Sequence, residues 1–330
     1  MSRFCLRSFP KRQNAVVPFT IEQYNSYLIV PEKRPNAVVR LFCFPFAGGN
    51  ASTYSAKWSS DLPKSIEYVA VQYPGRQGRS SEPFITDMKE LVSQITDALT
   101  PLIKKGNKPY SFFAHSLGTL VAYETALEIR RRKLPMPEQL ILSGRGAPGT
   151  TDPFGKPIDC GLPDREFADL CVSRFGPSPG LIDQRLFSVS LPPLRADMKL
   201  YYSYTPLLSE DSTPSCPIPL EKPLAVPVTV FGATGDPLSQ PEMLQTWQRF
   251  FTDEEDPDED SGSDSESSES ERRDDLYDDE MMKRKKELFF ERIVIDEPFH
   301  HYLERRNFKE DFMRCLSSLV VRSMEEEVWC

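Results

Sequence analysis

The chain has 330 residues, of which 39 % are hydrophobic, enough for one large α/β domain or two small ones. It has no apolar run near the roughly 20 residues of a membrane helix. Its seven scattered cysteines form neither a CxxC pair nor a Cys/His metal spacing, which argues against a disulfide framework and a zinc site. The net charge of −9 is concentrated, because residues 253–280 carry 16 acidic and 2 basic side chains, a net of −14, which leaves +5 on the rest.

Residues 1–20 open the chain with four basic side chains and no acidic one. They lack the long apolar segment of a secretory signal. Two interpretations stay open: an N-terminal extension that is frayed, or an organellar transit peptide. The cysteine usage predicts a reducing compartment, most simply the cytoplasm.

Strands and helices alternate along the rest of the chain. Short β-branched or aromatic runs predict strands over 37–44, 66–73, 110–116, 138–144, 226–233 and 290–296. Apolar residues at helical spacing predict helices over 87–105, 117–132, 241–251 and 308–324. The strands are apolar along almost their whole length, which is typical of a parallel sheet covered on both faces. The pattern predicts a doubly wound α/β fold built from residues 21–252 and 286–330.

Two segments interrupt this alternation. Residues 150–225 are rich in proline, with short amphipathic pieces such as 164–175. We expect a helical lid, about 150–205, over the carboxyl edge of the sheet, where open α/β sheets bind ligands. Residues 253–285 are expected to be a disordered acidic insertion, because dense like charge prevents independent folding. This insertion is either a solubilising loop or an acidic tether that competes with an acidic partner.

Residues 114–118, Ala-His-Ser-Leu-Gly, join a predicted strand to a predicted helix. They fit the G-x-S-x-G pattern of a nucleophile elbow, in which the residues two before and two after the serine must be small because strand and helix approach closely. Such a turn directs Ser116 Oγ out of the sheet and brings the N–H of Leu117 to the helix N-terminus. Ser116 is therefore the candidate nucleophile and Leu117 a candidate oxyanion donor.

The loop that follows the first predicted strand, Cys-Phe-Pro-Phe-Ala-Gly-Gly-Asn at 43–50, contains small residues. Such a loop lets backbone N–H groups approach a bound carbonyl. Phe46 or Ala47 is the candidate second donor, and we choose Ala47. The alternative is a tight glycine turn without a catalytic duty.

A serine nucleophile needs a base, and the chain has only three histidines, at 115, 300 and 301. His115 adjoins the nucleophile and is expected to pack behind it. His300 and His301 follow the last predicted strand, and Asp236 follows the strand before it. The order Ser116, Asp236, then His300 or His301 is that of α/β-hydrolases. Asp296 is the reserve acid.

Six blocks of sequence together resemble the type II thioesterases, the free-standing editing enzymes of polyketide and nonribosomal peptide synthesis. That family includes the animal thioesterase that releases medium-chain products from fatty acid synthase. The blocks are 41–58, 71–79, 115–118, 142–148, 191–204 and 300–303. The resemblance covers most of 37–320 and implies the α/β-hydrolase fold.

The resemblance implies that Ser116 is the nucleophile, Asp236 the acid and His300 the base. His300 is selected over His301 by aligning Tyr302 and Leu303 with the final positions of the family's histidine motif. The chain departs from that motif, because Pro298 and Phe299 replace two glycines.

The expected substrates are acyl thioesters on the phosphopantetheine arm of an acyl carrier protein. Carrier proteins are commonly acidic, so the net charge of +5 that this chain has outside residues 253–280 is of the sign that would attract them. We expect a monomer with no cofactor, no metal and no nucleic-acid partner. The alternatives are a carboxylesterase or lipase on the same fold, and a catalytically idle protein that binds a synthase.

Overall fold

The computed structural model describes residues 22–53, 58, 61–104, 107–252, 290–295 and 310–314. The predicted extension at 1–20 and the whole acidic insertion at 253–285 lie outside the described residues, as do Asp296, His300 and His301. None of the described helices is both long enough and apolar enough to cross a membrane.

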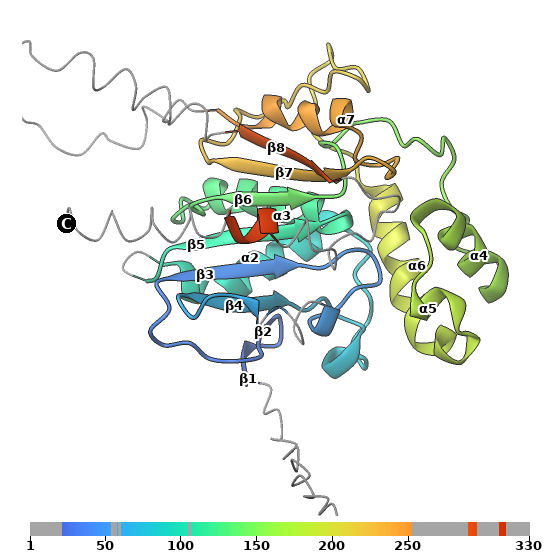
Figure 1. Ribbon diagram of the computed structural model, residues 1–330, viewed down its shortest axis with the longest axis horizontal. Coiled ribbons are helices and arrows are strands. Elements are labelled where there is room, and N and C mark those ends of the chain that lie inside the picture. Colours follow the sequence, from blue (N-terminus) through green and yellow to red (C-terminus); the bar gives the residue numbers. More distant parts are fainter. Residues whose placement is uncertain are drawn as a thin grey trace, which may run out of the picture.

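The described residues form an eight-stranded sheet with the order β1-β2-β4-β3-β5-β6-β7-β8 (Figure 1). The strands are β1 (Glu22–Asn25), β2 (Leu28–Val30), β3 (Val39–Phe44), β4 (Ile66–Val71), β5 (Tyr110–His115), β6 (Leu140–Ser143), β7 (Val228–Ala233) and β8 (Phe290–Ile295). Strands β3 to β8 run parallel, and β2 is antiparallel to both β1 and β4. The predicted, mostly parallel α/β sheet is confirmed.

All six predicted strands are present, but the sequence does not predict the β1–β2 hairpin at the sheet edge. Its strands have four and three residues, too few for a periodic pattern to stand out.

Both faces of the sheet are covered, as the continuous apolar strands predict. Phe112 and Phe113 of β5 point to opposite faces and belong to different hydrophobic clusters. On one face, Phe112 shares a cluster with the apolar sides of α2 (Met88–Ile103) and α3 (Leu117–Arg131). On the other, Phe113 packs against Trp58 and Phe312, with ring centroids 4.8 and 5.0 Å away.

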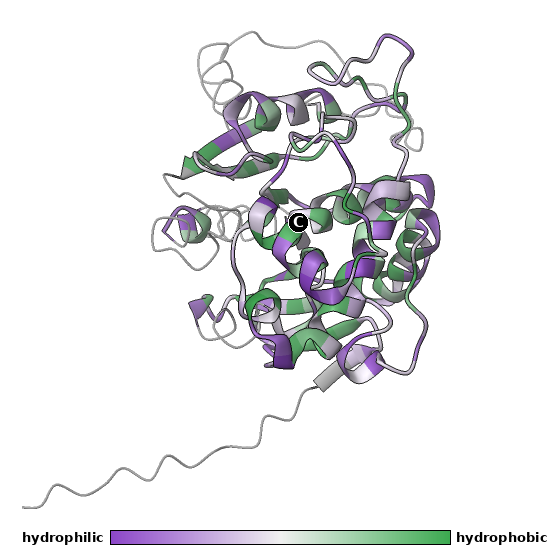
Figure 2. Ribbon diagram, turned by 90° about the vertical axis from the view of Figure 1, so that its right-hand side faces the viewer, coloured by the Kyte–Doolittle hydropathy of each residue, from purple (hydrophilic) through white to green (hydrophobic). Residues whose placement is uncertain are grey.

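The segment between β6 and β7 is helical and lies at the ends of the strand arrows in Figure 1. It contains α4 (Asp164–Phe175), α5 (Pro179–Ile182), the 3₁₀ turn η2 (Gln184–Leu186) and α6 (Phe187–Ser203). These helices share a hydrophobic cluster of their own. Figure 2 looks onto this edge and shows hydrophilic and hydrophobic residues interspersed along the helices there. The fold therefore has the helical lid that the sequence predicts.

Shorter helical elements lie outside the sheet and the lid. The 3₁₀ turn η1 (Gln77–Arg79) follows β4, and the predicted helix over 241–251 is α7 (Pro241–Gln245) followed by the 3₁₀ turn η3 (Thr246–Phe250). Of the predicted helix over 308–324, residues 310–314 are described, and they are helical.

Candidate active site

Ser116 occupies the turn between β5 and α3, with a backbone φ of 55° and ψ of −122°. A residue with a side chain adopts this conformation at a cost of about 1–3 kcal/mol, and such strain clusters at functional sites. The turn is held from both sides, because the N–H of Ser116 donates to Ser143 O at 2.8 Å and its carbonyl accepts from Thr119 N at 3.0 Å. The structure thus places the candidate nucleophile on a rigid, strained turn.

The packing of this turn requires a residue without a side chain at position 118. A Cβ on Gly118 would lie 2.6 Å from Phe44 O and 2.7 Å from Pro45 O, and both are backbone atoms that cannot move aside. Ala114 is fully buried in β5. The first turn of α3 therefore sits directly on the loop that follows β3, which is the loop expected to supply the second oxyanion donor.

The two candidate oxyanion donors, Ala47 and Leu117, line the same cavity as Ser116. Leu117 is the first residue of α3, so its N–H has no acceptor within the helix. In the donor loop (residues 45–50), Gly48 N donates to Asp197 Oδ2 at 2.7 Å and Gly49 N donates to Phe46 O at 2.8 Å. The N–H of Ala47 makes no hydrogen bond to any residue that the structure describes.

The donor loop is fixed by a buried ion pair that sequence reasoning missed. Arg76, from the turn after β4, pairs with Asp197 of α6 through two hydrogen bonds of 2.6 and 2.7 Å. Their side chains are 5 % and 1 % exposed. Arg76 Nη1 also donates to Gly49 O at 3.0 Å, and Asp197 accepts from Gly48 N. Both residues lie in blocks that resemble the thioesterases, but no local pattern shows that they pair.

Asp236 lies three residues after β7 and is fully buried. Its Oδ1 accepts from Leu238 N at 3.0 Å and its Oδ2 accepts from Ser239 Oγ at 2.6 Å, so its own loop orients the carboxylate. β8 runs parallel beside β7, with Ile295 in register with Ala233. β8 therefore ends at the same edge of the sheet as β7, the edge where Asp236 lies.

His115 is fully buried in β5. Its Nδ1 lies 3.0 Å from Ser143 Oγ, and its ring packs edge-on against Phe46 with centroids 5.9 Å apart. These contacts bind β5 to β6 and to the donor loop. They place His115 beneath the turn of Ser116.

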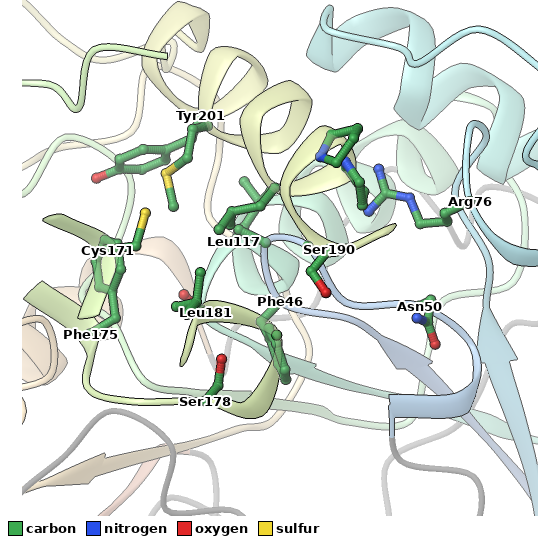
Figure 3. A pocket seen from close by; sticks show the side chains of 18 of the residues that line it. Phe46, Asn50, Arg76, Leu117, Cys171, Phe175, Ser178, Leu181, Ser190 and Tyr201 are labelled. Carbon is green, nitrogen blue, oxygen red and sulfur yellow. The ribbon is translucent and has the colours of Figure 1, made fainter. Parts of the chain in front are cut away.

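Ser116 opens into a cavity of about 590 Å³ between the sheet edge and the lid. Figure 3 shows Asn50, Arg76 and Ser190 on one side of it, and Cys171, Phe175 and Tyr201 on the other. Among the apolar residues of the lid, Phe175 and Leu181 line the cavity and also belong to the lid cluster. Phe187 and Leu170 pack in that cluster without lining the cavity, and Leu186 is 40 % exposed. The amphipathic pattern of the sequence predicts helices in the lid, but it does not identify which of their apolar residues line the cavity.

Cys171 is a second potential nucleophile in the lining of the cavity. Burial raises the pKa of the Cys171 thiol to about 12, so it stays protonated at neutral pH and does not compete with Ser116 as a nucleophile. Among the described residues, no three His, Cys, Asp or Glu side chains gather closely enough to hold a metal ion.

Comparisons with known proteins show which family the chain resembles. A family model described as "Thioesterase domain" matches residues 39–279. The gramicidin S biosynthesis protein GrsT of Aneurinibacillus migulanus is 34 % identical over 229 residues, which are 69 % of this chain and 82 % of the relative. The medium-chain S-acyl fatty acid synthase thioesterase of Homo sapiens is 31 % identical over 185 residues, 56 % of this chain and 69 % of the relative. The solved structure of RedJ, a thioesterase from the prodiginine biosynthetic pathway in Streptomyces coelicolor, is 25 % identical with a TM-score of 0.61 and covers 87 % of each chain.

The tight packing at Gly118 can be tested with an alanine substitution. We expect Gly118→Ala to lower the free energy of unfolding and to reduce kcat at least tenfold, because the added Cβ overlaps two backbone oxygens and must displace the elbow. Gly78→Ala is the matched control, since a Cβ there meets nothing within 4 Å. Chemical denaturation and hydrolysis of a small acyl thioester measure both effects. Equal results for the two variants would show that the elbow tolerates displacement.

The role of the buried pair can be separated from its contribution to stability. Arg76→Met leaves the Asp197 carboxylate buried without its cation, which is expected to cost about 3–5 kcal/mol, whereas Arg76→Met with Asp197→Leu replaces both charges by apolar groups and should recover most of that loss. The double variant still lacks the acceptor for Gly48 N, so we expect its kcat to stay at least tenfold low.

Denaturant unfolding and thioester kinetics on the same samples give both quantities. Arg185→Met removes an exposed pair with Asp183 and should change neither. Recovery of kcat together with stability in the double variant would contradict a positioning role.

Proposed function

Since the chain belongs to the thioesterase family and hydrolyses acyl thioesters, we propose that Ser116 is its nucleophile, His300 its base and Asp236 the acid that orients the base. The observation that carries this proposal is the strained turn at Ser116, which opens into the cavity beside the N–H groups of Ala47 and Leu117. The parallel ends of β7 and β8 support the pairing of Asp236 with the segment that holds the histidines.

The proposed reaction proceeds through an acyl-enzyme. His300 takes the proton of Ser116 Oγ as the oxygen attacks the acyl carbon, and the oxyanion accepts hydrogen bonds from Ala47 N and Leu117 N. His300 then protonates the departing thiol. Water, deprotonated by the same histidine, releases the acid in the second half. Asp236 holds the imidazole in the required tautomer and stabilises it when charged.

We assign the substrate as an acyl group on the phosphopantetheine arm of a carrier protein. The arm contains amides, and the side of the cavity with Asn50 and Ser190 offers polar partners for them. The side with Phe175 and Leu181 suits the acyl chain. The +5 charge outside the acidic segment fits an acidic carrier. The names of the relatives, which refer to peptide biosynthesis and to fatty acid synthase, support a carrier-bound substrate.

The nucleophile is tested by Ser116→Ala. We expect hydrolysis of an acyl-carrier substrate to fall by several orders of magnitude, with no loss of stability, because the substitution removes the attacking oxygen and little packing. Mass spectrometry of the intact protein after fluorophosphonate treatment should show one added label on the wild type and none on the variant. Activity within tenfold of wild type would refute the assignment.

The base is tested by alanine at each of the two adjacent histidines. His300→Ala should lose several orders of magnitude in kcat, as the removal of a base from a serine triad does, whereas His301→Ala should lose far less. Steady-state kinetics with one thioester substrate at fixed pH compares them directly. The reverse ranking would assign the base to His301, and small effects in both variants would remove this segment from the mechanism.

A further inference from the structure

Arg145 lies in the wall of the cavity, two residues after β6. Its backbone is anchored, because its carbonyl accepts from the indole Nε1 of Trp247 at 3.0 Å. Its own Nε donates to Gly146 O at 3.1 Å. Ser143, at the end of the same strand, accepts the N–H of Ser116. The backbone and the Nε of Arg145 are therefore held in place, at the end of the strand that also binds the turn of Ser116.

Arg145 differs from the other buried arginines in its partners. Four arginines of the described residues are buried, and they are Arg34, Arg76, Arg79 and Arg145. The first three each pair with a carboxylate, of Glu32, Asp197 and Glu82 respectively. Arg145 is 9 % exposed, yet neither Nη1 nor Nη2 makes a hydrogen bond or an ion pair to any residue that the structure describes. A buried charge without such partners is costly, so a role in binding accounts for its presence.

The surroundings of Arg145 place this charge on the acyl side of the cavity. Its Cζ lies 5.1 Å from the centroid of the Tyr201 ring, and Figure 3 shows Tyr201 on the side of Cys171 and Phe175, away from Asn50. Asp152 also lines the cavity but forms no ion pair with Arg145. Its Oδ1 instead accepts from Phe154 N at 2.9 Å, within its own turn. The guanidinium is thus a polar group within a mainly apolar wall.

We propose that Arg145 binds an oxygen of the acyl group, so that this thioesterase prefers acyl chains that carry a carbonyl or carboxylate oxygen over plain hydrocarbon chains. This inference rests on the proposed function, because it assumes that the acyl chain enters the side of the cavity with Phe175 and Leu181. A guanidinium has five N–H donors and Arg145 uses one of them within the protein, which leaves the donors of Nη1 and Nη2 for the ligand.

The test measures binding and not turnover. Pantetheine amides that cannot be hydrolysed would be titrated into the full-length protein by calorimetry, with hexanoyl, β-ketohexanoyl, δ-ketohexanoyl and adipoyl chains. We expect at least one oxygen-bearing chain to bind about tenfold or more tightly than hexanoyl, the scale of a hydrogen bond to a charged group. The keto and adipoyl arms distinguish a neutral acceptor from a carboxylate.

Arg145→Met should abolish this preference and leave hexanoyl affinity within about threefold of wild type, since methionine keeps much of the apolar bulk. Arg145→Lys should keep part of any preference for adipoyl. Arg249→Met removes an exposed arginine and should change nothing.

Equal binding of all four chains by the wild type would overturn the proposal, as would an equal loss for all four in Arg145→Met. The wild-type comparison applies even if that variant fails to fold. Failure of the proposed function is a separate result, because it is read from hydrolysis by wild type and Ser116→Ala and not from these affinities.

Discussion

Arg76 and Asp197 are 121 residues apart in the sequence, yet their two hydrogen bonds join three parts of the site. Arg76 follows β4, Asp197 belongs to the lid helix α6, and both hold the backbone of the donor loop at Gly48 and Gly49. A buried ion pair is weak evidence for stability, because desolvation offsets most of its attraction. Its value here is geometric: the lid cannot shift against the sheet without moving the loop that carries Ala47.

The cavity lies between the loops of the sheet edge and the helices of the lid, so its two sides differ in chemistry. The loops at the sheet edge contribute Ser116, Ala47 and Leu117 to its lining, while α4, α5 and α6 contribute apolar residues such as Phe175, Leu181 and Met198. A carrier-bound acyl group has the same division, with a polar arm on one side of the thioester and the acyl chain on the other. In the proposed mechanism, the N–H groups of Ala47 and Leu117 receive the developing charge, and both residues line the same cavity as Ser116.

Sequence reasoning succeeds where one local constraint decides the structure. The strands follow from continuous apolar runs, and the elbow from the small residues at 114 and 118, whose necessity the contacts of Gly118 explain. It fails where partners are distant along the chain. The pairing of Arg76 with Asp197 produces no periodic pattern in the sequence. That Arg145 is buried without a carboxylate partner becomes apparent only when the burial and hydrogen bonds of the other arginines are known. The roles of Ser116, Asp236 and His300 in catalysis stay predictions, as do those of the oxyanion donors Ala47 and Leu117.

The positive φ of Ser116 has a consequence for the evolution of the chain. Glycine adopts that conformation without the steric penalty that a side chain meets, so a glycine in this turn would relax the backbone and lack the hydroxyl. Stability and chemistry thus compete at a single codon. Selection that acted only on the stability of the folded state would therefore favour a protein without the hydroxyl. The abundance of a variant in a cell is accordingly a poor guide to its activity. The proposed role of Ser116 as the nucleophile accounts for a serine in so strained a position.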